Sequence, residues 1–291
     1  MLCRGTDSTC LRTYDEIPSF LQGNPCIRSG YRVELRTKLS CLKSLFWLSN
    51  ETVNVWSHLV AFLYFVVASI WVNCVVIPDT LSTWWDHFIF TFYLTCFQIS
   101  MLFSACFHLF NCCGSESYKW WLRVDLVGVT LGLCGCYIPG VYYAFHCHEH
   151  IQMSYIGTVC LLVLLCSTAQ LHPLFLSHRW HWKRLVLYSA VSLFGIIPFI
   201  HWITTVSFAV SILQLFYPKV LILYLLGSIG ALFYATRFPE KFFPGHVDLF
   251  GASHQWWHIL TALALVWWHL AAVELFLYRV TTSCPMTEKH V

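Results

Sequence analysis

Four ionisable side chains stand out because they fall at the ends of apolar segments. His254 and His258 are four residues apart, which places both imidazoles on one face of a helix. His108 and Asp125 lie near the ends of two other apolar segments. Ionisable groups inside a membrane segment are costly and indicate a functional site. Three imidazoles with one open coordination position are typical of a catalytic zinc site.

The predicted cofactor is therefore zinc, with His108, His254 and His258 as its ligands. Zinc can lower the pKa of a bound water to about 7, which makes hydroxide available at neutral pH. Asp125 could bind the metal, hydrogen-bond the water or act as its general base, and Ser104 could orient the water or polarise a substrate carbonyl. Two alternatives stay open: isolated polar groups that are hydrogen-bonded between helices, and a purely structural zinc.

The composition places these residues in a membrane protein. The chain has 291 residues, of which 58% are hydrophobic and 11% are charged, whereas a soluble domain carries roughly 25% charged residues. Seven apolar stretches are long enough to cross a bilayer, which takes about 20 residues. We expect an all-α, polytopic membrane protein with a seven-transmembrane helix bundle. The expected spans are 53–77, 86–110, 124–146, 151–176, 184–208, 218–237 and 252–278.

The distribution of basic residues predicts the orientation of the bundle. Fourteen of the 17 Lys and Arg residues fall in the N-terminal segment and in the loops after the second, fourth and sixth spans. Because basic loops stay in the cytosol, we expect a cytosolic N-terminus and a C-terminus that is outside or in a lumen. This topology brings the four ionisable side chains to one depth near the cytosolic ends of three helices. The expected regions are a cytosolic segment 1–50, a transmembrane domain 51–278 and a luminal tail 279–291.

The end of the cytosolic segment has two further features. Residues 36–50, RTKLSCLKSLFWLSN, combine spaced apolar and basic side chains, which predicts a short amphipathic helix on the cytosolic surface, with an extended lead-in as the alternative. Asn50-Glu51-Thr52 matches a glycosylation sequon, but its expected cytosolic position predicts that it is unmodified.

Most of the 15 cysteines lie within apolar segments, where cysteine behaves as a small hydrophobic residue. We therefore expect no disulfide framework. The candidates for a bridge near the non-basic side are Cys74, Cys147 and Cys284. For His58 and His201 we expect hydrogen bonds in the core, with a position lining the cavity as the alternative, and for His269 we expect a contact between helices.

At these residues the chain resembles the progestin and adipoQ receptor family, from about residue 14 to 278. The matching features are NETVNVWSH at 50–58, SACFH at 104–108, Asp125 and SHQWWH at 253–258. The resemblance implies a seven-helix fold with the N-terminus inside, around a zinc ion bound by three histidines. It assigns those ligands to the three histidines named above and places Asp125 near the zinc-bound water.

Three further segments resemble one member of that family, a Golgi membrane protein that holds Raf kinase and damps the Raf–MEK–ERK pathway. These segments are YDEIPSFLQGNPCIRSGYR at 14–32, FPEKFFPG at 238–245 and GASHQWWHIL at 251–260. The resemblance implies a Golgi location and Raf kinase as the partner of residues 14–50.

Other members of the family leave alternatives open. Adiponectin receptors are linked to zinc-dependent ceramide hydrolysis, so a lipid amidase is the alternative function and its lipid would be bound in the bundle. A lipid- or steroid-responsive receptor is a third possibility. The alternative locations to the Golgi are the plasma membrane and the endoplasmic reticulum. No nucleic-acid partner is expected.

Overall fold

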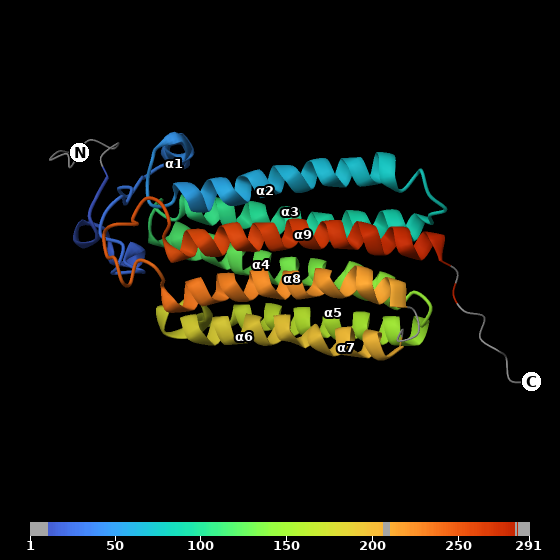
Figure 1. Ribbon diagram of the computed structural model, residues 1–291. Helices are drawn as coiled ribbons and strands as arrows, with labels where there is room; N and C mark the ends of the chain where they lie inside the picture. The colour runs from blue at the N-terminus through green and yellow to red at the C-terminus, as the bar shows by residue number, and fades with distance from the viewer. Residues whose placement is uncertain (1–10, 206–209, 283, 285–291) are drawn as a thin grey trace, which may run out of the picture.

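The protein is a bundle of long helices that run side by side, as the computed structural model in Figure 1 shows. The structure describes residues 11–205, 210–282 and 284. Seven helical spans in this part of the chain are long and apolar enough to cross a membrane, which confirms the predicted fold class. The long helices are α2 (Thr52–Trp71), α3 (Trp84–Phe110), α4 (Ser115–Ala144), α5 (Glu149–Leu171), α6 (His181–Phe194), α7 (Ile196–Thr205), α8 (Val210–Thr236) and α9 (Ser253–Thr281).

Two of the spans are not single regular helices. Helix α2 continues into a π-helical turn at Val72–Val76, so the span runs over Thr52–Val76. Helices α6 and α7 together form the span His181–Thr205, which is interrupted at Gly195. The predicted span 184–208 ends at residues that lie outside the described part of the chain.

Helix α2 shows how the sequence divides lipid contact from helix contact. Val60, Leu63, Val67 and Ile70 follow one another at helical spacing and are all more than half exposed. The opposite face of α2 carries the buried residues Ala61, Phe65 and Ala68, which pack into the core. The backbone polar groups of α2 are hydrogen-bonded within the helix, as a membrane requires. The apolar side chains of this outer stripe can therefore contact lipid.

The third span begins earlier than the sequence predicts. Helix α4 starts at Ser115 and not near residue 124, because its first turns carry charged residues that lower the local hydropathy without breaking the helix. The exposed Lys119 belongs to this extension and pairs with Glu116. Asp125 therefore lies well inside α4 and not at its beginning.

Glycines on α4 allow this helix to approach α3 closely. A Cβ atom at Gly132 would lie 2.9 Å from the Ser100 hydroxyl oxygen, and one at Gly135 would lie 2.9 Å from the Phe97 ring. Small residues at helix contacts let backbones approach in membrane proteins. The two helices run antiparallel, so this register brings Asp125 of α4 beside the last turns of α3.

The N-terminal segment covers the end of the bundle at which α2 and α9 begin (Figure 1). The backbone N–H groups of Arg28 and Ser29 donate to Asp248, at 3.0 and 2.8 Å. The Asn24 amide donates to Glu240, which is fully buried and also accepts from the Ser253 backbone. These bonds hold the described part of the segment against the loop between α8 and α9.

A short helix forms where the sequence predicts an amphipathic one. Helix α1 covers Lys38–Lys43 and is followed by a 3₁₀ turn at Ser44–Phe46, so the regular part is shorter than 36–50. Leu39 is 63% exposed and Phe46 is 79% exposed, while Cys41 is buried against the bundle. The exposed apolar side chains next to the start of α2 suit contact with a lipid surface.

The opposite end of the bundle is closed by a disulfide between Cys147 and Cys284. The expectation of no disulfide framework thus missed one bridge, which joins two of the three candidate cysteines. The two residues lie just after α4 and just after α9. The predicted tail 279–291 starts within α9, and its residues 283 and 285–291 lie outside the described part of the chain.

Candidate metal centre

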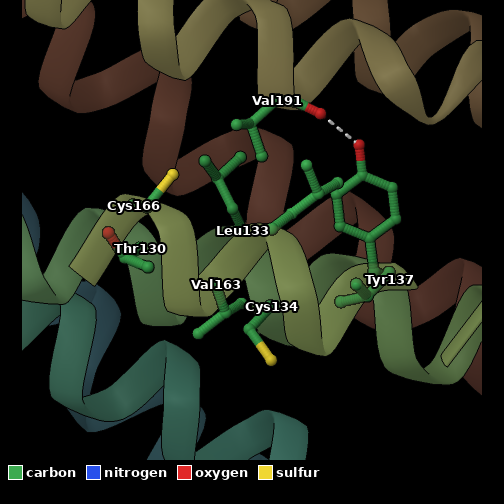
Figure 2. A pocket seen from close by; sticks show the side chains of 9 residues that line it. Thr130, Leu133, Cys134, Tyr137, Val163, Cys166 and Val191 are labelled. Atoms are coloured by element: carbon green, nitrogen blue, oxygen red, sulfur yellow. Dashed lines mark hydrogen bonds between the residues drawn. The ribbon is translucent and has the colours of Figure 1, made fainter. Parts of the chain in front are cut away.

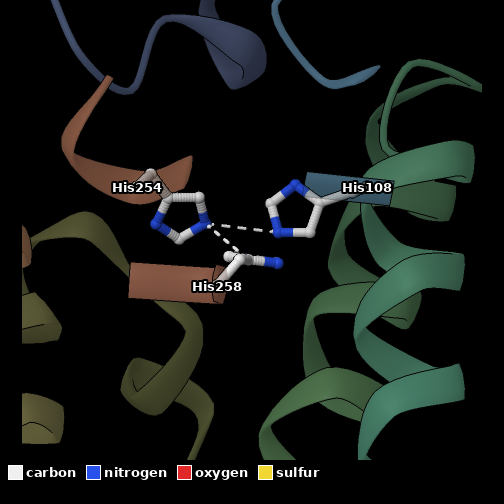
Figure 3. Close-up of side chains that lie close together, drawn as sticks. All are labelled: His108, His254 and His258. Carbon is white, nitrogen blue, oxygen red and sulfur yellow. Dashed lines mark hydrogen bonds between the residues drawn. The ribbon is translucent and has the colours of Figure 1, made fainter. Parts of the chain in front are cut away.

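Three histidines from two helices meet at the end of the bundle that carries the N-terminal segment (Figure 3). His108 comes from the last turn of α3, and His254 and His258 come from the first two turns of α9. The Nε2 atom of His254 lies 3.2 Å from Nε2 of His108 and 3.2 Å from Nε2 of His258. Four-coordinate zinc with Zn–N bonds near about 2.0–2.1 Å places its ligand nitrogens about 3.3 Å apart. The spacing of the three nitrogens therefore fits one zinc ion.

Hydrogen bonds on the outer side of two rings fix which nitrogen carries the proton. His108 Nδ1 lies 2.7 Å from the Glu51 carboxylate, and His258 Nδ1 lies 3.1 Å from the Asn54 carbonyl oxygen. Each Nδ1 must donate, because a carboxylate and a carbonyl oxygen only accept. In the neutral rings the Nε2 atoms then carry bare lone pairs, and both of these atoms lie 3.2 Å from His254 Nε2. This is the ligand tautomer that carboxylates and carbonyls impose on metal-bound histidines.

The resulting set of nitrogens is incomplete without a cation. A neutral His254 can donate its single Nε2 proton to His108 or to His258, but not to both. One of the two 3.2 Å contacts would then bring lone pairs together. A metal ion between the rings satisfies all three nitrogens at once, so the donor set fits zinc by its chemistry as well as by its spacing.

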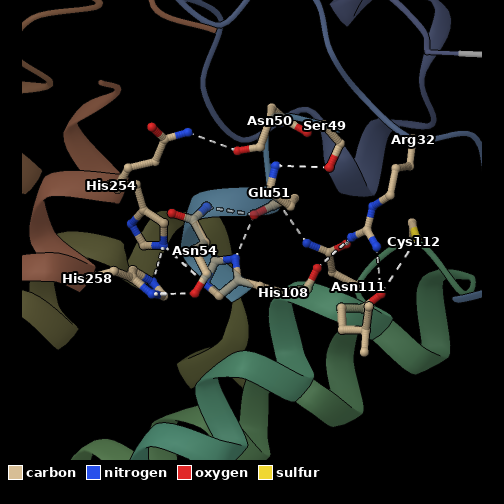
Figure 4. A network of polar contacts seen from close by, with 12 residues as sticks. Arg32, Ser49, Asn50, Glu51, Asn54, His108, Asn111, Cys112, His254 and His258 are labelled. Atoms are coloured by element: carbon tan, nitrogen blue, oxygen red, sulfur yellow. Dashed lines mark hydrogen bonds and ion pairs between the residues drawn. The ribbon is translucent and has the colours of Figure 1, made fainter. Parts of the chain in front are cut away.

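Glu51 is the centre of the hydrogen-bond network that orients His108 (Figure 4). Besides His108 Nδ1, its carboxylate accepts from the side-chain amides of Asn54 at 2.7 Å and Asn111 at 2.9 Å. Burial opposes its charge, but His108, Arg32 and the Asn54 hydrogen bond together hold the pKa of Glu51 well below its ordinary value. An ionised carboxylate in this position makes His108 a stronger ligand.

Arg32 brings the N-terminal segment into the same network. Its guanidinium group is buried, with 5% of the residue exposed, and donates to the backbone carbonyls of His108 and Leu109 at 2.5 and 3.0 Å. The last carbonyls of a helix lack partners within the helix and carry partial negative charge, so a cation is favourable there. Arg32 also donates to Asn111 Oδ1 at 3.1 Å. The position of His108 therefore depends on a residue far from it in the sequence.

Sequence reasoning missed Glu51 and Arg32. Glu51 is the middle residue of the sequon in the motif NETVNVWSH. It is also an acidic residue at the start of an apolar span. That position was a usable signal. No comparable signal marked Arg32, which is one of several basic residues in its segment.

Ser104 and Asp125, the two predicted assisting residues, lie beside His108. Ser104 is 7% exposed and is one turn before His108 on α3. The Asp125 carboxylate interacts with the Ser104 hydroxyl group and with His108, although it is not part of the three-nitrogen group. The close contact of α4 with α3 thus brings Asp125 to the histidine layer despite the earlier start of α4.

His58 and His269 make the contacts that the sequence predicts. His58 stacks on His258 with 3.9 Å between ring centroids, and its Nε2 lies 3.2 Å from the His258 carbonyl oxygen. His269 is a contact between helices, with Nδ1 2.8 Å from the Tyr93 hydroxyl oxygen. His58 therefore packs against a candidate ligand without adding a nitrogen to the group.

The fold and the site define a class of protein: a seven-helix membrane protein with a buried histidine layer near one end of the bundle. Comparison with known proteins gives the family. The model of the "Haemolysin-III related" family matches residues 46–270, and the chain belongs to this family, which includes the progestin and adipoQ receptors. The resemblance found in the sequence is therefore confirmed.

Individual relatives are similar over most of this chain. It is 40% identical to progestin and adipoQ receptor family member 3 of Homo sapiens, over 97% of this chain and 91% of the relative. It is 29% identical to progestin and adipoQ receptor-like protein 1 of Caenorhabditis elegans, over 94% of this chain and 62% of the relative. It is 30% identical to the adiponectin receptor protein of Drosophila melanogaster, over 93% of this chain and 60% of the relative.

Proposed function

We propose that this protein is a receptor-like Golgi membrane protein that holds zinc in its histidine layer and sequesters Raf kinase at its N-terminal segment. Through this partner it negatively regulates Raf–MEK–ERK signalling. The observation that carries the proposal is the packing of the N-terminal segment onto the histidine layer, through Arg32 and Glu51. The sequence resemblance at residues 14–32 supports Raf kinase as the partner.

His108, His254 and His258 would hold the zinc ion, and Glu51 and the Asn54 carbonyl would orient two of their rings. When bound, zinc supplies a Lewis acid and lowers the pKa of a coordinated water. In the tether proposal the zinc ion would stabilise the junction of α3, α9 and the N-terminal segment. The histidine layer then keeps the segment in the arrangement that Raf kinase recognises.

The N-terminal segment offers an exposed surface for a cytosolic partner. Asp15 and Glu16 are exposed on a 3₁₀ turn near the start of its described part. The excess of basic residues in this segment and in the loops at the same end supports a cytosolic position. We therefore place the kinase on the side of the segment that carries these two acidic residues.

Imaging of tagged Raf kinase in cells tests the tether. We expect the wild-type protein to draw Raf kinase onto the Golgi, and the Asp15→Lys/Glu16→Lys variant to recruit less of it. Glu116→Lys is the matched control, because Glu116 is also exposed but lies on α4. Deletion of residues 14–50 is a poor test, since it would remove Arg32 from the network around His108.

A second variant, His254→Ala/His258→Ala, tests whether recruitment depends on the histidine layer. We expect recruitment to fall at matched expression, because the layer supports the N-terminal segment. Raf kinase that stays diffuse in cells with well-expressed wild-type protein would contradict the tether.

A zinc-dependent lipid amidase is the second candidate, and Ser104 and Asp125 beside His108 favour it. These two residues could position a substrate carbonyl and accept or donate a proton next to the metal. The test is ceramide hydrolysis by purified full-length protein, compared with Asp125→Asn and Ser104→Ala. A wild-type rate no higher than that of His254→Ala would remove this candidate.

The third candidate function, a lipid or steroid receptor, would need a ligand pocket. A hollow lies between α4, α5 and α6 (Figure 2). Its cavity volume is about 10 Å³, room for about one water molecule, and the Tyr137 hydroxyl group on its wall already donates to the Val191 carbonyl at 2.5 Å. Small-molecule sites usually measure about 300–1,000 Å³ and present a few polar groups that can bond to the ligand. This hollow therefore gives no specific support to a steroid ligand.

A further inference from the structure

Three cysteine thiols gather where α1 meets the turn after α3. Cys41 of α1 is 0% exposed and Cys112 is 1% exposed, and both belong to one small apolar cluster with Leu35. The neighbouring Cys113 is half-buried. The Cys41 thiol lies close enough to the thiols of Cys112 and Cys113 to interact with both. All three cysteines lie outside the membrane spans.

The main chain on both sides of this cluster is fixed. The Leu35 N–H donates to the Cys112 carbonyl at 2.9 Å, which ties the N-terminal segment to the turn after α3. Arg32 donates to Asn111 Oδ1, one residue before Cys112. Cys41 is itself placed by α1, whose N-cap Thr37 accepts from the Ser40 backbone. The backbone bonds around Cys112 and the helix that carries Cys41 therefore keep the two buried thiols close to each other.

The surroundings of Cys112 favour its thiolate form. Its interaction with the Cys41 thiol and the charge of Arg32 outweigh burial and lower the pKa of Cys112. The thiolate is the nucleophilic form of cysteine, and nearby cations generate it. Cys41 is the opposite case, because its interaction with the Cys112 thiol and its burial raise its pKa. One thiol is thus suited to attack an oxidant and the other to resolve the product.

We propose that Cys41 and Cys112 form a reversible disulfide, with hydrogen peroxide as the oxidant, that links the N-terminal segment covalently to the end of α3. The Cys112 thiolate attacks one peroxide oxygen, the O–O bond breaks, and the leaving hydroxide takes a proton to become water. The Cys41 sulfur then attacks the sulfenic sulfur, the S–O bond breaks, and a second water leaves with the Cys41 proton. Two thiols are oxidised and one peroxide is reduced to two waters.

The compartment supports a regulatory bond and not a permanent one. We place this end of the bundle in the cytosol, where thiols are kept reduced and disulfides are transient. The bridge Cys147–Cys284 lies at the opposite end of the bundle, just after α4 and α9. A bond between Cys41 and Cys112 would fix the N-terminal segment, which is the proposed site for Raf kinase, in its docked position.

Peptide mapping of the full-length chain in membranes tests the disulfide. Samples are treated with hydrogen peroxide or left untreated, capped with N-ethylmaleimide under denaturing conditions, and digested with trypsin and chymotrypsin. We expect peroxide to raise severalfold the amount of peptide around Cys41 linked to the peptide around Cys112, and dithiothreitol to remove the link. This readout does not involve Raf kinase, so it can succeed or fail independently of the tether.

Variants identify the partner of Cys41. The link should persist in Cys113→Ser and in the matched control Cys26→Ser, and should be lost in Cys112→Ser. Equal capping of Cys41 with and without peroxide in the wild-type protein would overturn the proposal, whatever the folding of the variants. A link from Cys41 to Cys113 would overturn the assignment of the pair.

Discussion

The two ends of α3 and α9 both carry buried polar groups, but the groups are balanced in different ways. At the end where α9 finishes, the fully buried Asp86 accepts from Arg279 at 3.0 and 3.2 Å and from the Thr83 backbone at 2.7 Å. The Tyr143 hydroxyl group donates to it as well, at 3.3 Å. At the end where α9 begins, two imidazole nitrogens with bare lone pairs lie 3.2 Å from a nitrogen of a third imidazole that has one proton at most to offer there.

The difference separates a structural network from a ligand site. Asp86 has an opposite charge and several donors around it, so the protein itself completes the group and joins α3, α4 and α9. The histidine layer has its outer hydrogen bonds complete, through Glu51 and Asn54, while its inner nitrogens still need a cation. Buried polar groups in native proteins are nearly always satisfied. The incomplete end is therefore the one expected to bind a metal.

The largest expected effect is the loss of zinc from His258→Ala. Zinc sites in small domains contribute roughly 10–16 kcal/mol, so the loss of one of three protein ligands should cost about 3 kcal/mol or more of binding free energy. Zinc content of purified protein and competition with a chelator measure this. The matched control is His269→Ala, since His269 is also a buried histidine of α9 but contacts Tyr93. Equal zinc loss in both variants would contradict the assignment.

At the opposite end, Asp86→Asn should reduce stability and leave zinc in place. The breaking of a fully buried ion pair costs about 3–5 kcal/mol, and we expect about 2–3 kcal/mol here, since the Arg279 side chain is 20% exposed and can reach water. Thermal unfolding in detergent and zinc content are measured on the same sample. A loss of zinc in the folded variant would show that the two ends are not independent.

Glu51→Gln should have an intermediate effect on the metal. The amide keeps the shape of the side chain but removes the charge that faces His108 Nδ1, and such outer-shell changes typically weaken metal binding about 10–100-fold. Chelator competition gives the affinity. The control is Glu116→Gln, because Glu116 is 85% exposed and pairs only with Lys119 at the surface. An unchanged zinc affinity in Glu51→Gln would rule out its orienting role.

The smallest effect on the metal is expected for Ser104→Ala. Ser104 contacts Asp125 and is not one of the three converging side chains, so the change removes at most one hydrogen bond, worth about 1 kcal/mol. Zinc content should stay at the wild-type value. Loss of zinc from this variant would mean that Ser104 belongs to the metal site itself.

Local patterns in the sequence were enough for the spans and for the three histidines. Apolar length defined the spans, and the spacing of His254 and His258 together with antiparallel topology placed them near His108. The start of α4 was misjudged because hydropathy measures lipid contact, whereas a helix can extend beyond the membrane with residues such as Lys119.

Features that depend on contacts distant in sequence were not predictable in this way. Arg32 reaches His108 only because the N-terminal segment docks on the loop between α8 and α9. The pairing of Cys147 with Cys284 depends on the distance between the ends of α4 and α9, which no local pattern reports. Glu51 could have been predicted from the sequence, since a histidine that binds a metal commonly donates its other ring N–H to a carboxylate.

The central claim is that the histidine layer holds zinc, and metal analysis of the purified full-length protein tests it most directly. Elemental analysis combined with X-ray absorption should give about one zinc per chain, with nitrogen ligands near about 2.0–2.1 Å. The His254→Ala/His258→Ala variant, purified in the same way, should lose that zinc. Wild-type protein that is folded but carries no more zinc than the double variant would contradict the account.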